Sequence, residues 1–248
     1  MTACEGETVA NKALGGKAVG GVALGILMLQ ARFPRIEGEV GNALTFDFPV
    51  HYKVVRGASP ERVVLQGAPG LLDAFVEGAR ELVAMGADGI TTNCGFLSVF
   101  QAEMAAAVGV PVASSSLMQV AMVQRMLPEG RRVGLITISE ESLTAAHLHA
   151  AGVPEGTPIV GMPQECHFAR VILGDRLELD VARARADMLE AGETLLRAHD
   201  DIAAVVLECT NMCPYSAALA AHLQRPVFDM AGFIRWFHGG LRPVRPRA

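Results

Sequence analysis

Lysine is scarce in this chain, and long apolar runs are absent. Of the 248 residues, only Lys12, Lys17 and Lys53 are lysines, and none lies near the cysteine motifs described below. A Schiff base with pyridoxal phosphate would need one of these three, and their positions suit it poorly. The longest apolar run, Val19–Leu29, has 11 residues, whereas a transmembrane helix needs about 20. We therefore expect neither pyridoxal phosphate nor a membrane as a partner.

Excess charge and secretory features are also lacking. The chain has 21 basic and 26 acidic residues and a net charge of −5, which does not favour nucleic-acid binding. With 51% hydrophobic and 19% charged residues, it is too apolar for a disordered protein. Five cysteines are an odd number, which favours reduced thiols in the cytoplasm over a disulfide framework. Residues 1–17 contain no apolar segment before a cleavage site, so they predict a flexible N-terminus rather than a secretory signal.

Short runs of Val, Ile and Leu alternate with longer stretches rich in Ala, Leu and Arg. Continuous apolar runs are typical of strands that are buried on both faces. The expected strands are Val22–Leu29, His51–Val55, Gly89–Thr92, Val110–Ala113, Val133–Ile138, Pro158–Gly161, Ala203–Leu207 and Val227–Phe228. The expected helices are Leu71–Met85, Ala102–Val108, Ala182–His199 and Ala217–Leu223, with Asp180 capping the third and Pro214 opening the last. This alternation predicts an α/β fold with parallel sheets and right-handed crossovers.

An internal repeat appears when the sequence is shifted by 115 residues against itself. Cys94 then falls on Cys209, and Pro111 falls on Pro226. In each copy an apolar strand ends in a polar residue and a cysteine, a helix follows, and a Pro-Val strand comes next. Chance matches of Ala and Val are expected in so Ala-rich a chain, but they do not explain the joint agreement of Cys, Pro and element order.

The repeat predicts two pseudosymmetric α/β lobes. The first lobe is expected to comprise residues 18–115 and 229–248, and the second residues 116–228. Each lobe offers one cysteine at the C-terminal end of a strand, which is the edge where open α/β sheets bind ligands. We therefore expect an active site in the cleft between the lobes.

A cysteine directly before a helix has a chemical consequence. The free N–H groups and the positive end of the helix dipole stabilise a thiolate, and the same N–H groups bind a substrate carboxylate. Two such half-sites could remove a proton from a carbon next to a carboxylate and return one from the opposite face. The polar neighbours Asn93, Thr210 and Asn211 fit this chemistry.

Other roles for the cysteines remain open at this point. Each could be a small buried packing residue, as free cysteines usually are. A metal site could use Cys209 and Cys213, which have C-x₃-C spacing, together with His167, but structural zinc sites usually show two closely spaced ligand pairs. The Gly-rich stretches at residues 15–16 and 20–21 do not form G-x-G-x-x-G after a strand. We therefore expect no metal and no nucleotide cofactor.

In residues 30–48, after the first expected strand, the apolar residues follow neither helical nor strand spacing. A long irregular segment of this kind is often a functional loop. It carries several aromatic residues that can exclude water and two arginines, Arg32 and Arg35, that can pair with a carboxylate. This loop could cover the active site or mediate contact between subunits, and both could hold in an oligomer.

The two cysteine segments resemble the aspartate/glutamate racemase superfamily. Residues 207–210, Leu-Glu-Cys-Thr, are similar to that family's apolar strand ending in Gly-Cys-Thr. Residues 92–96, Thr-Asn-Cys-Gly-Phe, match more loosely, because amino-acid racemases usually have Cys-Asn-Thr there and the order of Asn and Cys is inverted. The loop at residues 33–50 resembles the dimethylsulfoniopropionate-lyase branch of the superfamily.

This resemblance implies a cofactor-independent enzyme that forms a homo-oligomer, a dimer or tetramer, and acts on a small carboxylate-containing substrate. It implies Cys94 and Cys209 as the acid–base pair. The expected substrate-binding residues are Asn93, Gly95, Phe96, Thr210, Asn211, Arg35 and Asn42.

The resemblance leaves the reaction open, because one fold hosts many functions. Our first hypothesis is a racemase or epimerase. The alternative is a lyase of the same superfamily, acting by β-elimination on a substrate such as dimethylsulfoniopropionate, or a decarboxylase. A non-catalytic protein that binds a small molecule is the third hypothesis, and the paired cysteines argue against it because binding alone needs no thiols.

Overall fold

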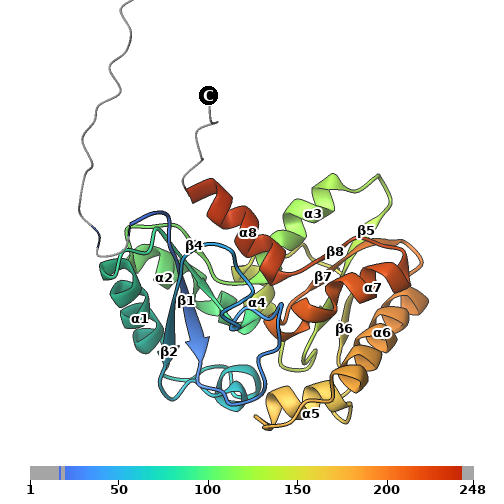
Figure 1. The fold of residues 1–248 in the computed structure, drawn as a ribbon. Coiled ribbons are helices and arrows are strands. Elements are labelled where there is room, and N and C mark those ends of the chain that lie inside the picture. Colours follow the sequence, from blue (N-terminus) through green and yellow to red (C-terminus); the bar gives the residue numbers. More distant parts are fainter. Residues whose placement is uncertain (1–16, 18–19, 242–248) are drawn as a thin grey trace, which may run out of the picture.

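The computed structural model describes Lys17 and residues 20–241, and these residues contain two four-stranded sheets flanked by helices (Figure 1). The first sheet has the order β2-β1-β3-β4, and the second has the order β6-β5-β7-β8. All neighbouring strands are parallel. The strands are β1 Leu24–Leu29, β2 Val50–Val55, β3 Gly89–Thr92, β4 Val112–Ala113, β5 Arg132–Thr137, β6 Ile159–Gly161, β7 Ile202–Leu207 and β8 Val227–Phe228. The expected α/β fold with two parallel-sheet lobes is confirmed.

Helices cover the sheets as the apolar strand runs require. In the first lobe, α1 (Leu72–Ala84) packs on β1 and β2 and buries Phe75, Ala79 and Leu82. In the second lobe, α6 (Val181–Ala198) buries one apolar stripe at helical spacing. Its expected cap is confirmed, because the Asp180 side chain accepts the amide hydrogens of residues 182 and 183. The shorter helices are α2 Gln101–Ala107, α3 Val120–Met126, α4 Ala145–Ala150, α5 His167–Leu173 and α7 Ser216–Leu223.

The last helix, α8 (Met230–Leu241), connects the two halves of the molecule. It follows β8 of the second sheet and packs against β3 of the first (Figure 1). Phe233 and Ile234 of α8 join Leu24 and Ile26 of β1 in a common apolar cluster. This return of the chain is compatible with the expected lobe boundaries, which stay a prediction.

The sequence analysis erred on some local elements. It did not expect α3, α4, α5 or α8. It placed Pro214 at the opening of a helix, but Pro214 lies inside a 3₁₀ helix, η4 (Thr210–Tyr215), and α7 begins only at Ser216. A 3₁₀ helix, η2 (Gly95–Phe100), likewise precedes α2. Both cysteines therefore precede a 3₁₀ turn rather than an α-helix.

The expected flexible N-terminus, residues 1–17, lies outside the described residues except for Lys17, which forms an ion pair with Asp88. Two short elements complete the fold: a π-helical turn, η1 (Glu61–Leu65), and a 3₁₀ helix, η3 (Ser116–Gln119). The helices were also compared with membrane-spanning segments. None of the helices in the described residues is both long enough and apolar enough to cross a membrane.

Candidate active site

The two cysteines meet at one cavity between the sheets. Cys94 follows β3 and precedes η2, while Cys209 follows β7 and precedes η4. Each is 7% exposed, and neither is in a disulfide. Both line a small cavity of about 20 Å³, together with the polar residues Asn93, Glu208 and Asn211. The C-terminal ends of the equivalent strands β3 and β7 therefore lie at the same cavity.

The rest of the cavity wall is apolar and comes from both lobes. Its members are Leu29, Phe33, Pro60, Val64, Ile138, Ile172 and Leu173. Such a wall excludes water, and exclusion of water strengthens electrostatic interactions inside the cavity. The cavity is therefore suited to reactions in which charge develops on a substrate.

Burial decides the protonation of both thiols. Burial first, and then the Glu208 charge, raise the pKa of Cys94 well above its usual value and that of Cys209 to about 12. The backbone amide of Phe96 lowers the pKa of Cys94, but this effect is smaller. The expectation that the following helix would yield a stabilised thiolate is therefore wrong for the resting site, because desolvation outweighs the N–H groups.

Glu208, directly before Cys209, is a fully buried carboxyl in this site. Its Oε2 accepts hydrogen bonds from the Thr137 hydroxyl (2.9 Å) and the Ile138 amide (3.3 Å). Its Oε1 is buried and has no partner of hydrogen-bonding geometry within the described part of the chain. Burial raises the pKa of Glu208 to about 7, and the hydrogen bonds, with the nearby Gly95 amide, offset this only in part. This carboxyl can therefore be charged or neutral near neutral pH.

Gly95 lies directly against Glu208 across the interface between the lobes. A Cβ at residue 95 would lie 2.7 Å from the Glu208 carbonyl oxygen and would overlap its Oε1. Contacts below 3.0 Å essentially do not occur for real Cβ atoms. Position 95 therefore admits only glycine while Glu208 keeps this conformation.

Hydrogen bonds connect the two half-sites. The Thr210 hydroxyl donates to the Asn93 carbonyl at 2.6 Å, which links η4 to the end of β3. The Thr92 hydroxyl accepts the Cys94 amide at 3.2 Å. In the second half-site, Asn211 Nδ2 donates to the Cys209 sulfur at 3.5 Å, and Asn211 Oδ1 is buried with no partner among residues 20–241 or Lys17. The unpartnered oxygen is a candidate contact for a substrate.

The irregular loop after β1, between β1 and β2 in Figure 1, contributes to the wall of the cavity. Its Phe33 is buried and lines the cavity, and the Arg35 guanidinium lies 4.6 Å from the centre of the Phe33 ring. Arg35 also donates to buried Glu39 at 2.7 Å, and its charge lowers the pKa of Cys94. Asn42 donates to the Arg35 carbonyl at 2.7 Å. The loop thus places one positive and one negative charge close to the cysteines.

The same loop is attached to the second lobe at two points. The Asp175 carboxylate, just after α5, accepts the amides of Arg32 (2.5 Å) and Phe33 (3.1 Å). At the other point, Gly38 packs against Pro214 of η4. These contacts show that the segment spans the interface between the lobes.

The structure places the expected substrate-binding residues at different depths. Asn93 and Asn211 line the cavity with the two cysteines. Gly95, Phe96 and Thr210 lie in the turns that follow the cysteines, where buried Phe96 packs edge-on against the His147 ring. Arg35 and Asn42 lie behind Phe33 in the loop, and both side-chain groups of Asn42 bond within it. The substrate-binding roles of these seven residues stay predictions.

Sequence reasoning missed Glu208 and Phe33 as site residues. The repeat contained the signal for Glu208, because a shift of 115 residues places it on Asn93, a residue already chosen. A carboxyl at the end of a strand buried on both faces is unusual, since charged side chains are almost never fully buried unless paired. Phe33 had no comparable signal, because its approach to the cysteines depends on the path of the loop.

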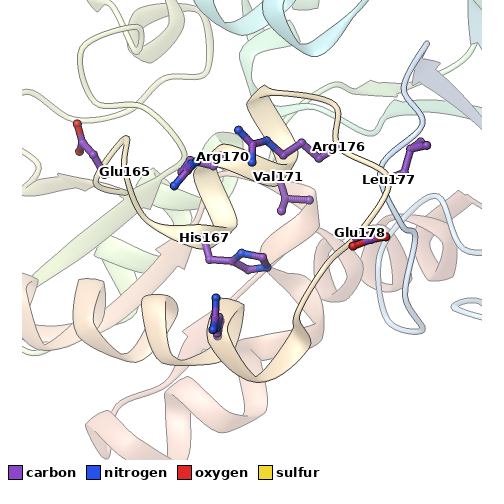
Figure 2. A pocket seen from close by; sticks show the side chains of 8 residues that line it. Glu165, His167, Arg170, Val171, Arg176, Leu177 and Glu178 are labelled. Atoms are coloured by element: carbon purple, nitrogen blue, oxygen red, sulfur yellow. The ribbon is translucent and has the colours of Figure 1, made fainter.

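The alternative metal site finds no support in the arrangement of side chains. Lys17 and residues 20–241 contain no group of three or more His, Cys, Asp or Glu side chains that could hold a metal ion. Cys213 packs in the apolar cluster with α8. His167 lies in a separate hollow of about 590 Å³ between α5 and the beginning of α6, where its Nε2 accepts the Asp180 amide at 2.9 Å (Figure 2). The proposed ligands are therefore not gathered at one place.

Comparisons with known proteins agree with this geometry. Among curated relatives, dimethylsulfoniopropionate lyase 6 of Emiliania huxleyi is 31% identical over 217 residues, 83% of this chain and 56% of that protein. The dimethylsulfoniopropionate lyase of Durusdinium sp. clade D is 26% identical over 215 residues, 83% of this chain and 70% of that protein. The chain thus spans little more than half the length of the Emiliania relative.

Solved structures show the same fold at low sequence identity. Arylmalonate decarboxylase has a TM-score of 0.58 at 19% identity, covering 90% of this chain and 96% of that one. Allantoin racemase from Klebsiella pneumoniae has a TM-score of 0.60 at 17% identity, covering 89% and 87%. The family model described as Asp/Glu/Hydantoin racemase matches residues 72–233, which include both cysteines. The chain belongs to the Asp/Glu/hydantoin racemase family.

Proposed function

We propose that this enzyme is a cofactor-independent lyase that removes the proton α to a carboxylate and expels a leaving group from the β carbon. The leaving group we favour is a dialkyl sulfide, so that the substrate is a sulfonium such as dimethylsulfoniopropionate. A cysteine thiolate takes the α proton, the bond from the β carbon to the leaving group breaks with its electron pair, and a carbon–carbon double bond forms.

One observation carries this proposal: two thiols share a cavity, but their half-sites are unequal. Asn93 stands before Cys94, whereas the carboxyl of Glu208 stands before Cys209. Elimination needs one stereospecific proton abstraction, so it does not need matched half-sites. The names of the curated relatives support the same choice, since the two described above are dimethylsulfoniopropionate lyases.

The charges around the site also suit a substrate with both signs of charge. Arg35 lies near Cys94 and can attract a carboxylate. Glu208 lines the cavity and, when ionised, can attract a sulfonium. A cavity of about 20 Å³ holds about one water molecule, so a substrate of this size enters only when the surrounding loop or α5 moves.

Racemisation is the second candidate, favoured by the equivalent positions of the two cysteines in the repeat. A racemase removes a proton on one face and returns one on the other, which requires an acid and a base on opposite sides. The paired thiols supply this arrangement in principle.

A single incubation separates the two reactions. The protein is incubated in D₂O with dimethylsulfoniopropionate and, in parallel, with amino acids, hydantoins and arylmalonates, and the products are followed by NMR and mass spectrometry. We expect acrylate and dimethyl sulfide in equal amounts, and no product from the Cys94→Ser, Cys209→Ser double variant. The proposal is overturned if no substrate is cleaved while deuterium enters the α position of both enantiomers of an amino acid or hydantoin.

A further inference from the structure

Asn93 and Glu208 occupy equivalent places in the two lobes. The Asn93 amide donates to the Leu27 carbonyl at 3.0 Å, and its side-chain oxygen accepts the Leu29 amide at 2.8 Å. In the second lobe the Glu208 amide donates to the Ile136 carbonyl at 2.9 Å, and its carboxyl accepts the Ile138 amide at 3.3 Å. The same backbone position thus carries a group that cannot titrate in one lobe and a group that can in the other.

The position of the Glu208 carboxyl is suited to proton transfer. Glu208 lines the same small cavity as Cys94, before η2, and Cys209, before η4, and its charge acts on both thiols. The groups that bind it from the end of β5, Thr137 and Ile138, are uncharged. One carboxylate oxygen is buried and unpartnered within the described residues. One hydrogen-bonding position on this carboxyl is therefore open.

The proposed elimination needs a final proton acceptor, whereas racemisation does not. A sulfonium carboxylate has no net charge, whereas its products are a carboxylate anion, a neutral sulfide and one proton. That proton must leave the site before the next turnover. In racemisation the opposite thiol supplies a proton to the product, so no proton is released overall.

We infer that Glu208 is the proton acceptor to which the catalytic thiol gives up its own proton during the reaction, an inference that rests on the proposed lyase function. The thiol passes its proton to the Glu208 carboxylate as the sulfur takes the α proton and the bond to the leaving group breaks. The elimination drives this transfer, because the pKa of the thiol lies above that of Glu208, and it leaves a protonated thiol and a neutral carboxylic acid. Water accepts the proton when the site opens, and the carboxylate is restored.

The chemistry of the buried group agrees with this role. Its pKa of about 7 allows it to accept and release a proton near neutral pH. The titrations of Glu208, Cys94 and Cys209 are coupled, so the charge on one changes the proton affinity of the others. Glu208 therefore sets the pH range in which a thiolate can exist in the cavity.

The test measures this coupling directly, through alkylation of each cysteine as a function of pH. Wild type and Glu208→Gln are treated briefly with iodoacetamide, and the peptides containing Cys94 and Cys209 are quantified by mass spectrometry. Above about pH 7, where the wild-type carboxyl is ionised, we expect both thiols of Glu208→Gln to react about tenfold faster. Below about pH 7 the wild-type carboxyl is neutral, so the two profiles should converge. Identical profiles at all pH values overturn the inference.

Two further variants guard against a merely structural effect. Glu39→Gln removes another buried carboxyl, whose charge acts on Cys209, and it should shift the Cys209 profile more than the Cys94 profile. Glu208→Asp restores a carboxyl and should return part of the wild-type pH dependence, even if Glu208→Gln folds poorly. If alkylation of the two cysteines in Glu208→Asp shows none of the wild-type pH dependence, the proposed role is contradicted.

Turnover separates this inference from the proposed function. We expect kcat of Glu208→Gln for dimethylsulfoniopropionate to fall about 10²-fold, with a smaller change in KM, as is typical when a proton-transfer group is lost. If wild type cleaves the substrate and Glu208→Gln cleaves it equally fast, only the role of Glu208 fails. If wild type does not cleave it, the proposed function fails, and the alkylation profiles still decide whether Glu208 controls the thiols.

Discussion

The first lobe places its cysteine between an amide and a glycine, whereas the second places its cysteine between a carboxyl and a hydroxyl. The triplets are Asn93, Cys94 and Gly95 in one lobe and Glu208, Cys209 and Thr210 in the other. Their backbones make matching hydrogen bonds to the neighbouring strand. The comparison teaches that the duplicated backbone fixes where the two sulfurs lie, while the side chains beside them determine their proton chemistry.

The differences between the lobes fit one another across the interface. Thr210 of the second lobe donates to the Asn93 carbonyl of the first at 2.6 Å. Gly95, its counterpart in the first lobe, has no hydroxyl to return such a bond, and Glu208 lies against it instead. Two similar half-sites therefore form a single active site that is not symmetric.

The largest expected effect comes from removing each sulfur in turn. Cys94→Ser and Cys209→Ser should each lower kcat by at least about 10²-fold, because each removes a positioned proton-transfer group. For a lyase the two losses should be unequal, since a single proton abstraction depends on one thiol more than the other. Cys166→Ser is the matched control, because Cys166 caps α5 outside the cavity and serine is a good N-cap residue. Equal losses for the two cavity cysteines would favour a racemase.

The second largest expected effect is on the free energy of unfolding. It comes from Glu208, whose carboxyl has no counterpart at the equivalent position of the first lobe. The pKa of Glu208 is raised from 4.5 to about 7 in the folded protein, so folding favours the protonated form. Its contribution is fully present below about pH 4.5 and is lost as the pH rises through about 7. The free energy of unfolding of wild type, relative to Glu208→Gln, should therefore fall by about 3 kcal/mol over this range.

Urea unfolding at a series of pH values measures this difference, and the other titrating groups cancel between the two proteins. Asn93→Asp offers the reverse experiment, because it introduces a buried carboxyl into the first lobe. It should add a decline of the same sign over the same pH range. Parallel stability curves for wild type and Glu208→Gln would show that the carboxyl is not desolvated in solution.

The smallest effect concerns the loop that connects the lobes. Arg35→Ala should raise KM for an anionic substrate about tenfold, because a charge-assisted hydrogen bond is lost. Arg32→Ala is the control on the same loop, since the Arg32 side chain is 73% exposed and that of Arg35 is only 16% exposed. Steady-state kinetics checks the difference. An unchanged KM together with an altered oligomeric mass would indicate that Arg35 belongs to a subunit interface instead.

Much of the fold could be predicted because the strands are continuous apolar runs buried on both faces. The sequence analysis located all eight strands of the described residues, and β3 and β8 matched to the residue. It missed helices whose sequences carry weak signals. The α4 helix has only six residues, and α8 contains three glycines, which have low helix propensity. Local patterns could not show that tertiary packing would stabilise these segments.

The site could be predicted only as far as the repeat reached. The 115-residue shift brought Cys94 and Cys209 together, and the structure places both at one cavity. The same shift could not show that Glu208 would be buried beside both thiols, because this depends on how β7 meets β5 and η2. The high thiol pKa values were missed for a related reason, since desolvation is a property of the assembled site rather than of the motif.

The close approach of Gly95 and Glu208 also constrains how the two halves of the gene can diverge. A side chain at position 95 would meet both the carboxyl and the main-chain carbonyl oxygen of residue 208, so a shorter residue 208 removes only the first of the two clashes. The backbone of one residue therefore restricts another position that lies more than a hundred codons away in the gene. Random mutagenesis of this gene should therefore recover no active Gly95→Ala clone, even among clones that carry a smaller residue at position 208.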